Sequence, residues 1–562
     1  MTINGAQILT TLLERQGIKI VAGLPGGPIL PFYDALKSSS IEHVLVRHEQ
    51  GAGFIAQGMA RTTGKAAVCL ASSGPGATNL VTAVADAYLD SIPMVAITAQ
   101  VPQSLIGTDA FQEVDTYGLM IPITKHNFLV RSPAELLEVI PLAFSIAESG
   151  RQGPVSVDIP KDVLTGTLEL GEWPEPGRPE KAPAIADDQI KELAALITKA
   201  RHPIIYLGGG VISANASALA HELTRRIQAP IVSTLMALGA IPPDEPLYMG
   251  MLGMHGSKAT NFLLEETDLL IAIGARFDDR ATGKAAEFCP TATIVHIDID
   301  RAEIGKIKQP FLSLHGDANE ILGKLLATLP AQQRPDWVRR TLELKAAHDL
   351  RMPSAAEDPL HPLGFCRTLA SLIPSDSIVT TDVGQHQMWI AQAYPVRHPR
   401  GLLTAGGLGS MGFGLPAAIG ASLAAPGKRV VCITGDGSIM MNIQELATLA
   451  ELDLPVAIII MNNAHLGLVR QQQELFYGQR YHACKFASKP DFAAIARGFG
   501  IRGVRIDPND DPLAQIQREL ARPGPVLIDM PIVEGAKVLP MVPPGAANRV
   551  MICEPEKAEC SC

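Results

Sequence analysis

Short apolar runs alternate with amphipathic segments along most of the chain. The opening residues, 1–17, have the pattern of a capped amphipathic helix, and no basic leader segment is expected. Buried strands are then predicted at 18–22, 41–47, 66–71, 94–98 and 155–158, with helical segments between them. Uninterrupted apolar strands separated by helices are typical of an open parallel sheet that is covered on both faces.

The same alternation resumes after two connecting segments. A polar, proline-rich linker at 168–186 ends the first unit, and a charged connector at 330–362 ends the second. We therefore expect an α/β protein of three doubly wound parallel-sheet domains, with the first and third built on one plan. Strands of the second unit are predicted at 204–207, 231–233, 269–273, 294–297 and 312–314. The expected boundaries are 1–168, 188–330 and 363–540, followed by a tail at 541–562.

The most informative stretch lies in the third unit. A strand predicted at 430–434 ends in GDG, a helix-period segment follows, and a strand predicted at 456–461 ends in NN. In such a βαβ unit the strands are parallel, so Asp436 and Asn463 are expected side by side at one edge of the sheet. Their carboxylate and amide oxygens suit Mg²⁺, and the two glycines allow a diphosphate to approach backbone N–H groups. An ordinary crossover with a glycine turn also explains GDG taken alone.

GDG and NN at this spacing resemble the cofactor motif of thiamine-diphosphate-dependent enzymes. The resemblance implies that Asp436, Asn463 and the backbone carbonyl of His465 coordinate Mg²⁺, which holds the diphosphate. In this family a glutamate binds N1′ of the aminopyrimidine and favours the imino form that removes the C2 proton. Glu49 stands in the matching place, although a glutamate there also suits the N-terminus of a helix. The family builds its sites across a dimer, so the third unit of a partner chain is expected to face Glu49.

Further motifs narrow the family. They occur in the order LPGG (24–27), RHEQG (47–51), SGPGATN (73–79), IGTDAFQE (106–113), GPVSVDIPKD (153–162), GARFDDR (274–280), GQHQMW (384–389) and GLGSMGFGLPAAIG (407–420). With these motifs the chain resembles the catalytic large subunits of acetohydroxyacid synthase, also called acetolactate synthase, from about residue 5 to 545. The resemblance implies that pyruvate is decarboxylated on thiamine diphosphate and that the resulting carbanion is joined to a second 2-ketoacid. Pyruvate as acceptor gives 2-acetolactate and 2-ketobutyrate gives 2-aceto-2-hydroxybutyrate, in branched-chain amino-acid biosynthesis.

The resemblance also implies roles for single residues. Arg280 is expected to grip the acceptor carboxylate, the alternative being a loop residue paired to Asp278 or Asp279. Gly26 is expected to present its N–H to the reacting centre. Core packing also explains Met254, which is expected on the acceptor side. The whole expected catalytic set is Glu49, Gly26, Phe111, Gln112, Lys161, Met254 and Arg280. Contacts with thiamine diphosphate are implied for Gln385, His386, Gly409, Met411, Gly435, Gly437, Ser438, His465, Leu466, Gly467 and Leu468.

The middle unit has glycines after two predicted strands and aspartates after others, a pattern that favours a dinucleotide site. By resemblance the ligand is FAD, in a structural role because carboligation transfers no net electrons. The alternative is a structural middle domain that binds no ligand, since it would have the same pattern of glycines and aspartates. The G-x-G-x-x-G match at 407–412 is rejected as a second dinucleotide site, since no clear acidic residue stands at the end of a nearby second strand. Expected FAD contacts are Arg151, Gly208, Gly209, Gly210, Leu235, Met236, His255, Gly274, Arg276, Asp278, Asp298, Ile299, Asp317 and Ala318.

Two positions depart from the family pattern. Many members carry a tryptophan in the segment after the metal site, where it is associated with a preference for 2-ketobutyrate and with herbicide stacking. This chain has Gln472 there, which predicts weaker discrimination between acceptors and weak herbicide binding. Leu468 likewise stands where methionine is common.

Composition limits which partners and which location are expected for the protein. A net charge of −10 argues against a nucleic-acid surface, and no apolar run is long enough to span a membrane, so we expect a cytoplasmic protein. Cys553, Cys560 and Cys562 match no zinc template, and free thiols in an acidic tail are expected. A homodimer of catalytic chains with a small regulatory subunit is expected. The alternatives are a flavin pyruvate oxidase or 2-ketoacid decarboxylase on the same architecture, and a non-catalytic paralogue that acts as a partner.

Overall fold

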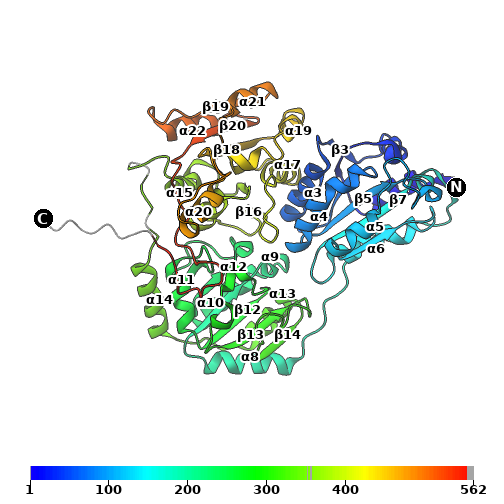
Figure 1. Cartoon of the computed structure of the whole chain (residues 1–562). Coiled ribbons are helices and arrows are strands. Elements are labelled where there is room, and N and C mark those ends of the chain that lie inside the picture. Colours follow the sequence, from blue (N-terminus) through cyan, green and yellow to red (C-terminus); the bar gives the residue numbers. More distant parts are fainter. Residues whose placement is uncertain (1, 351, 355–356, 554–562) are drawn as a thin grey trace.

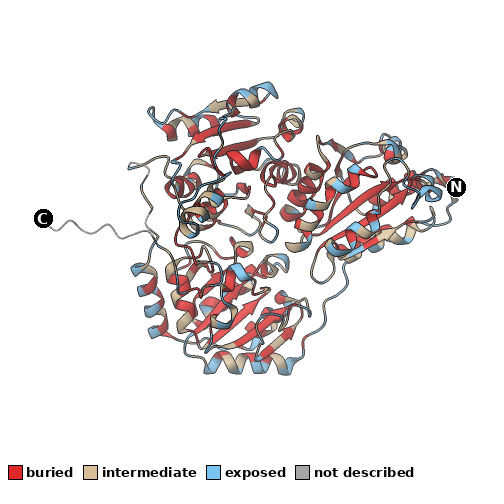
Figure 2. Cartoon of the chain, viewed as in Figure 1, coloured by how far each residue is buried: buried red, intermediate tan, exposed pale blue. Residues whose placement is uncertain are grey.

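The computed structural model describes residues 2–350, 352–354 and 357–553 (Figure 1). Three six-stranded sheets, each with helices on both faces, form three units of an α/β protein. Figure 2 shows the strands buried between helices whose outer faces are exposed. Within the described chain, no helix has both the length and the hydropathy that a membrane span requires. Three parallel sheets of this kind confirm the predicted fold class.

The first unit has the spatial strand order β3-β2-β4-β5-β7-β6, and all its pairings are parallel. In addition, β1 (Thr2–Asn4) pairs antiparallel with β8 (Thr167–Glu169). The six strands are β2 (Ile20–Gly23), β3 (Glu42–Leu45), β4 (Ala67–Ala71), β5 (Met94–Gln100), β6 (His126–Leu129) and β7 (Pro154–Pro160). The helices are α1 (Gly5–Arg15), α2 (Leu30–Leu36), α3 (Glu49–Thr63), α4 (Pro75–Leu89), α5 (Thr116–Met120), α6 (Leu136–Glu148) and α7 (Lys161–Thr165).

The middle unit has the order β11-β10-β9-β12-β13-β14, so the chain reverses direction across the sheet between β9 and β12. Its strands are β9 (Pro203–Leu207), β10 (Ile231–Ser233), β11 (Tyr248–Met251), β12 (Leu269–Ile273), β13 (Thr293–Asp298) and β14 (Leu312–His315). Its helices are α8 (Asp187–Lys199), α9 (Gly210–Ser213), α10 (Ser217–Ile227), α11 (Lys258–Leu263), α12 (Asp279–Thr282), α13 (Ala318–Thr328) and α14 (Pro335–Ala347).

The third unit has the order β16-β15-β17-β18-β20-β19, which is the connectivity of the first unit repeated. Its strands are β15 (Ile378–Thr381), β16 (Leu402–Leu403), β17 (Val430–Gly435), β18 (Val456–Asn462), β19 (Arg502–Arg505) and β20 (Val526–Pro531). Its helices are α15 (Pro362–Leu372), α16 (Gln385–Ala393), α17 (Gly414–Ala424), α18 (Asp436–Ile439), α19 (Glu445–Leu452), α20 (Gly467–Phe476), α21 (Phe492–Gly498) and α22 (Pro512–Leu520). The expectation of one plan for both units is confirmed.

Helices α3 and α17 join the first and third units at close range. A Cβ on Gly58 of α3 would overlap the carbonyl oxygen of Ala417 on α17. Reciprocally, a Cβ on Gly420 of α17 would overlap the carbonyl oxygen of Ile55 on α3. The two glycines therefore allow backbone-to-backbone packing, and their reciprocal placement reflects the repeated plan of the two units.

Several local predictions differ from the structure. The helix-period segment after GDG forms two short helices, α18 and α19, because the chain turns between them. The connector at 330–362 contains α14, which packs Trp337 into the core of the middle unit. Of the linker predicted at 168–186, residues 168 and 169 belong to β8, and residues 170–186, all of them described, contain no helix or strand. Of the tail, Cys553 is exposed with a free thiol, while Cys560 and Cys562 lie outside the described residues.

Candidate active site

The edge of the third sheet brings Asp436 and Asn463 together. Their strands, β17 and β18, are hydrogen-bonded neighbours in parallel register, with Gly435 opposite Met461. Backbone N–H groups of Gly437 and Ala464 face the Asp436 carboxylate, so both strand ends converge on it. Burial raises the pKa of Asp436 to about 6, and a bound cation would lower this pKa again.

The orientation of the Asn463 side chain is set by its neighbours. The Asn463 amide donates to Gln385 Oε1 at 3.3 Å, and its Oδ1 accepts the His465 N–H at 3.0 Å. The oxygen therefore faces the turn at 463–465, and the Ala464 N–H of this turn faces the Asp436 carboxylate. In the described part of the chain, no cluster of three or more His, Cys, Asp or Glu side chains is suited to hold a metal. The candidate site differs from such a cluster because it combines one carboxylate with an amide oxygen and a backbone carbonyl.

His386 adds an unsatisfied polar atom beside this edge. Its ring is buried and packs where Gly435 has no Cβ, since a Cβ there would lie 3.1 Å from the ring. Burial lowers the pKa of His386 to about 3, so the imidazole is neutral, and Nε2 has no hydrogen-bond partner among the described residues. Gly409 leaves open space, with its nearest neighbour 3.9 Å from a Cβ position. The buried orphan nitrogen of His386 fits a polar ligand such as a diphosphate, and the open space at Gly409 leaves room for a ligand there.

Glu49 is the first residue of α3, and its side chain is buried. The carboxylate accepts a hydrogen bond from Asn79 Nδ2 at 2.9 Å, and Gly76 leaves room for it on α4. Ser72 lies on the other side of Gly76, and its hydroxyl, 2.5 Å from a Cβ position on Gly26, is buried without a partner in the described chain. A buried carboxylate near an unsatisfied hydroxyl and a bare backbone suits a polar heterocyclic ligand.

Three other residues of the expected catalytic set lie on the surface of the first unit. Phe111 is 88% exposed, and Lys161 is exposed at the start of α7. Gln112 has a φ of 60°, and its backbone packs against Gly74, where a Cβ would lie 2.8 Å from the Gln112 carbonyl oxygen. In the single chain these side chains do not meet Glu49 through any contact that the structure describes.

Arg280 and Met254 meet in the middle unit. Arg280 Nη1 lies 3.7 Å from Met254 Sδ, and the Met254 N–H donates to the Arg280 carbonyl at 2.8 Å. The Arg280 guanidinium is 65% exposed and reaches Asp279 only at 3.7 Å between exposed groups, a weak pairing in water. Met254 is half-buried, so its environment is not that of a core methionine. The guanidinium is therefore open to an anionic ligand.

The middle sheet gathers the expected dinucleotide contacts at its switch point. Gly208 and Gly210 follow β9, and Gly274 follows the adjacent β12 with a φ of 58°; a Cβ on Gly210 would lie 2.7 Å from the Gly274 Cα. Asp298 ends β13 and Asp317 follows β14 at the same edge. Open α/β sheets bind ligands at this point. The same edge or the loops after it carry Gly209, Leu235, Met236, Arg276, Asp278, Ile299 and Ala318.

Two expected FAD contacts have distinctive surroundings. His255 Nδ1 is buried without a partner in the described chain, and burial lowers the pKa of His255 to about 4. Arg151 of the first unit already pairs with Asp300 at 3.2 Å and Glu303 at 2.6 Å in the middle unit. The Arg151 pairs therefore join the first and middle units, and the side chain is held near the middle sheet.

The chain matches three domain models of thiamine pyrophosphate enzymes: the N-terminal TPP binding domain at 3–119, the central domain at 190–325 and the C-terminal TPP binding domain at 382–530. The acetolactate synthase isozyme 1 large subunit of Escherichia coli (strain K12) is 56% identical over 552 residues, 98% of each chain. The isozyme 2 large subunit of that organism is 47% identical over 554 residues, 98% of this chain and 99% of that protein.

This chain belongs to the acetolactate synthase large-subunit family. A probable acetolactate synthase large subunit of Methanocaldococcus jannaschii, 46% identical over 557 residues, covers 97% of the chain and 94% of that protein. Membership of the family confirms the resemblance found in the sequence. The first and third units of this family member are therefore thiamine-diphosphate-binding domains.

Sequence reasoning missed supporting residues of the acetolactate synthase site. Asn79 holds the Glu49 carboxylate, and it lies in a motif, SGPGATN, that was singled out for another reason. Gln471 is buried beneath Gln385, whose Nε2 donates to its Oε1 at 2.9 Å. Neither residue's supporting role is visible in its own segment, because each acts through a side chain distant in the sequence.

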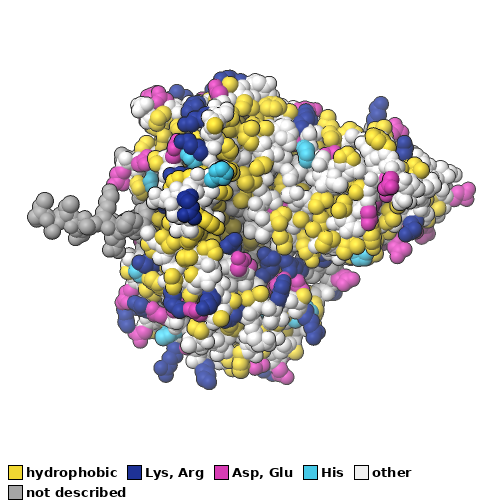
Figure 3. All heavy atoms as spheres, in the orientation of Figure 1, with side chains coloured by type: hydrophobic (Ala, Val, Ile, Leu, Met, Phe, Trp, Pro, Cys, Tyr) yellow, Lys and Arg dark blue, Asp and Glu magenta, His cyan; other side chains and the backbone are white. Residues whose placement is uncertain are grey.

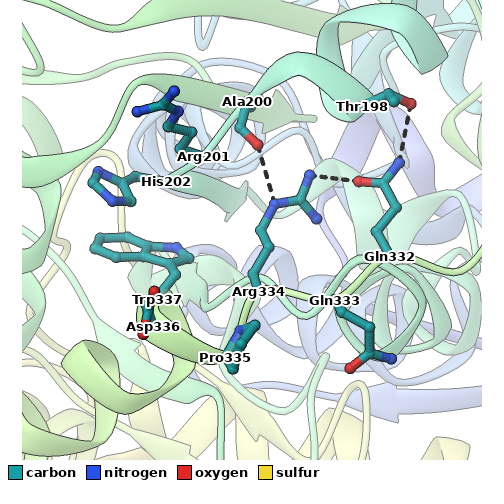
Figure 4. Close-up of a pocket in the computed structure, with 10 residues that line it drawn as sticks. All are labelled: Thr198, Ala200, Arg201, His202, Gln332, Gln333, Arg334, Pro335, Asp336 and Trp337. Carbon is teal, nitrogen blue, oxygen red and sulfur yellow. Dashed lines mark hydrogen bonds between the residues drawn. The ribbon is translucent and has the colours of Figure 1, made fainter.

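A separate hollow of about 570 Å³ lies at the opposite edge of the middle sheet (Figure 4). Arg334 lies against it and donates to the backbone carbonyls of Ile197, Ala200 and Ile227, and the His202 and Trp337 rings stack. These donations satisfy helix ends, so Arg334 supports the fold of the middle unit. None of the expected site residues lines this hollow.

Proposed function

We propose that this chain decarboxylates pyruvate and joins the remaining two-carbon unit to a second 2-ketoacid, as an acetolactate synthase of branched-chain amino-acid biosynthesis. The observation that carries the proposal is the open Arg280 guanidinium beside Met254, because a simple decarboxylase needs no cation for an acceptor carboxylate. Pyruvate and 2-ketobutyrate are the proposed acceptors. Bidentate binding to the guanidinium would fix the acceptor's ketone toward the reacting carbon.

Thiamine diphosphate, when bound, supplies the nucleophilic carbon and the electron sink for decarboxylation. Asp436, Asn463 and the His465 carbonyl would hold Mg²⁺, and the orphan His386 nitrogen suits a diphosphate oxygen. Glu49, buried and held by Asn79, would hydrogen-bond N1′ of the aminopyrimidine. The Gly26 N–H would face the developing oxyanion.

We also propose that FAD lies at the switch point of the middle sheet in a structural role. The orphan His255 nitrogen and the close Gly210–Gly274 approach support a ligand there. Carboligation moves no net electrons, so the flavin needs no redox partner.

A second copy of the chain completes the proposed site. Phe111, Leu119 and Ile121 are exposed apolar side chains of the first unit, and Figure 3 shows apolar side chains spread over this unit near α5 and α6. Burial of such side chains favours a homodimer in which Glu49 faces the third unit of the partner. The relatives named as large subunits support a small regulatory subunit as a further partner.

Product analysis tests the proposal. The purified chain is incubated with pyruvate, thiamine diphosphate, Mg²⁺ and FAD under nitrogen, and acetolactate is the expected product. Replacing the general acid–base group by Glu49→Gln should lower the rate by about a hundredfold or more. Glu148→Gln, which removes a carboxylate that accepts the Ala66 N–H in the same unit, is the matched control and should retain activity. Acetaldehyde or acetate as the main product would instead assign a decarboxylase or an oxidase.

A further inference from the structure

A buried cluster of charges joins the first unit to the third and has no part in the proposed chemistry. Arg61 on α3 lies 2.7 Å from Asp90 and 3.4 Å from Asp86, both on or just after α4. The three side chains are 4%, 0% and 0% exposed in the order Arg61, Asp86 and Asp90. Buried ionised groups are costly unless every one is paired, so such clusters specify one arrangement of the chain.

The cluster holds the glycine-rich turn at 404–412 of the third unit. Asp90 accepts the N–H of Gly406 at 3.0 Å with one oxygen and the N–H of Gly407 at 2.7 Å with the other. Asp86 accepts the Ser410 hydroxyl at 2.8 Å, and Arg61 donates to the Thr404 carbonyl at 2.9 Å. The first half of the turn is thus bound by side chains of another unit.

The second half of the turn is held from within the third unit. Asp382 accepts the N–H of Gly412 at 2.8 Å and of Gly414 at 3.2 Å. Asn442 donates to the Gly412 carbonyl at 2.8 Å and to Gln50, the neighbour of Glu49, at 3.1 Å. Met411 lies between these two sets of contacts, and Gly409 lies just before Ser410 of the first set; both are proposed contacts of the cofactor.

We propose that Asp90, supported by Arg61 and Asp86, is a positioning residue that sets the turn at 404–412 for thiamine diphosphate; the inference rests on the proposed function. A turn rich in glycine loses much conformational freedom when it is ordered. The two oxygens of one carboxylate fix two consecutive N–H groups, and this pre-forms the turn before the cofactor binds. The first unit therefore contributes to two cofactor sites. Glu49 contributes to the site that faces the third unit of the partner, and Asp90 contributes to the site of its own chain through the turn at 404–412.

The test compares Asp90→Asn with the milder Ser410→Ala in the purified full chain. Asparagine keeps one acceptor and turns a donor toward the second N–H, so one glycine N–H loses its partner. Hydrogen–deuterium exchange of the peptide at 404–413, measured without cofactor, should be faster in Asp90→Asn and moderately faster in Ser410→Ala. The dissociation constant and the apparent KM of thiamine diphosphate should rise about tenfold in Asp90→Asn, while the KM of pyruvate changes less than about twofold.

Glu245→Gln is the matched control, because Glu245 is a buried carboxylate of the middle unit paired with His221 and Arg225. It should leave both the exchange of the turn and the cofactor constants unchanged. Unchanged exchange in Asp90→Asn, an equal rise in Glu245→Gln, or faster exchange with an unchanged cofactor dissociation constant would each overturn the proposal. A parent protein that binds no thiamine diphosphate would overturn the proposed function, while the exchange comparison would still decide whether Asp90 holds the turn.

Discussion

At the residue scale, Asp158 is a buried carboxyl group that supports the loop of Gln112. It accepts the Thr98 hydroxyl at 2.6 Å and the Gln100 amide at 3.1 Å, and that amide also donates to the Val114 carbonyl at 2.8 Å. Burial raises the pKa of Asp158 to about 7, so the folded state keeps a proton that the unfolded chain releases near pH 4. Since the unfolded state binds fewer protons between these values, this group stabilises the fold less as the pH rises from 4 to 7.

We predict that Asp158→Asn makes the pH dependence of stability flatter. Relative to the parent, the free energy of unfolding of the variant should improve by roughly 1 to 3 kcal/mol between pH 5 and pH 8. Denaturant unfolding of both proteins at several pH values measures this difference, in which the contributions of all other groups cancel. An identical pH dependence in both proteins would show that Asp158 is ionised in the folded state at all these pH values.

Gln472 carries the second prediction at this scale. Its side chain is exposed on α20, next to the buried Gln471 that holds Gln385. A flat apolar side chain in this place would favour the larger acceptor, because one extra methylene in an apolar pocket is worth about 1 to 3 kcal/mol. Gln472→Trp should therefore raise the ratio of 2-aceto-2-hydroxybutyrate to 2-acetolactate about tenfold in competition between the two acceptors. Gln473→Trp is the matched control. A parent protein that already prefers 2-ketobutyrate to pyruvate by tens-fold would contradict the prediction.

At the element scale, the α3–α17 contact depends on glycine. In Gly58→Val a side chain would overlap the Ala417 carbonyl, which the backbone of α17 cannot avoid without moving. The free energy of unfolding should fall by at least about 2 kcal/mol. Gly323→Val on α13 is the control, since no atom lies within 4 Å of its Cβ position, and it should change stability by less than about 0.5 kcal/mol. Equal effects of the two substitutions would show that helix propensity, not the close packing, decides the outcome.

The periodicity of the sequence predicts the central strands of the first two sheets, but at their edges it predicts β3 and β14 and misses β6 and β11. Strands such as β9 and β12 are uninterrupted apolar runs because helices cover both faces, so their ranges agree closely with the prediction. Edge strands β6 (HNFL) and β11 (YMGM) mix polar and apolar residues, because one side of each strand is unpaired, and neither was predicted. Helix α14 was not predicted, because its charged outer face obscures the helical period of its apolar residues, although Trp337 is buried on its inner face.

The sequence likewise predicts one part of the candidate site and misses another. Asp436 and Asn463 were expected side by side because they end consecutive strands of one βαβ unit, a local relation that the sequence contains. The bonds from Gly406 and Gly407 to Asp90 join residues more than three hundred positions apart and exist only once two units pack. No periodic pattern within either segment encodes such a contact.

At the scale of the whole molecule, the end of the described chain belongs to the middle unit. Met541 and Ile552 exchange backbone hydrogen bonds and close a loop, and the Val542 N–H donates to the Met254 carbonyl at 2.8 Å. Asn548 donates to the Ala281 carbonyl at 2.9 Å, directly after Arg280. The loop therefore holds the backbone on both sides of the proposed acceptor clamp.

A chain that ends after Pro540 loses these contacts and the pairs of Arg549 with Glu265 and Glu287. Acetolactate formation should fall about tenfold or more, because a misplaced clamp loses the effective concentration of the acceptor. Exchange of the peptide at 276–284 should become faster. A chain that ends after Cys553 keeps every one of these contacts and is the matched control. If the shorter chain kept parental activity and exchange, Arg280 would be positioned by the loop of α12 alone, through the Asp278 carboxylate that accepts its N–H at 3.1 Å.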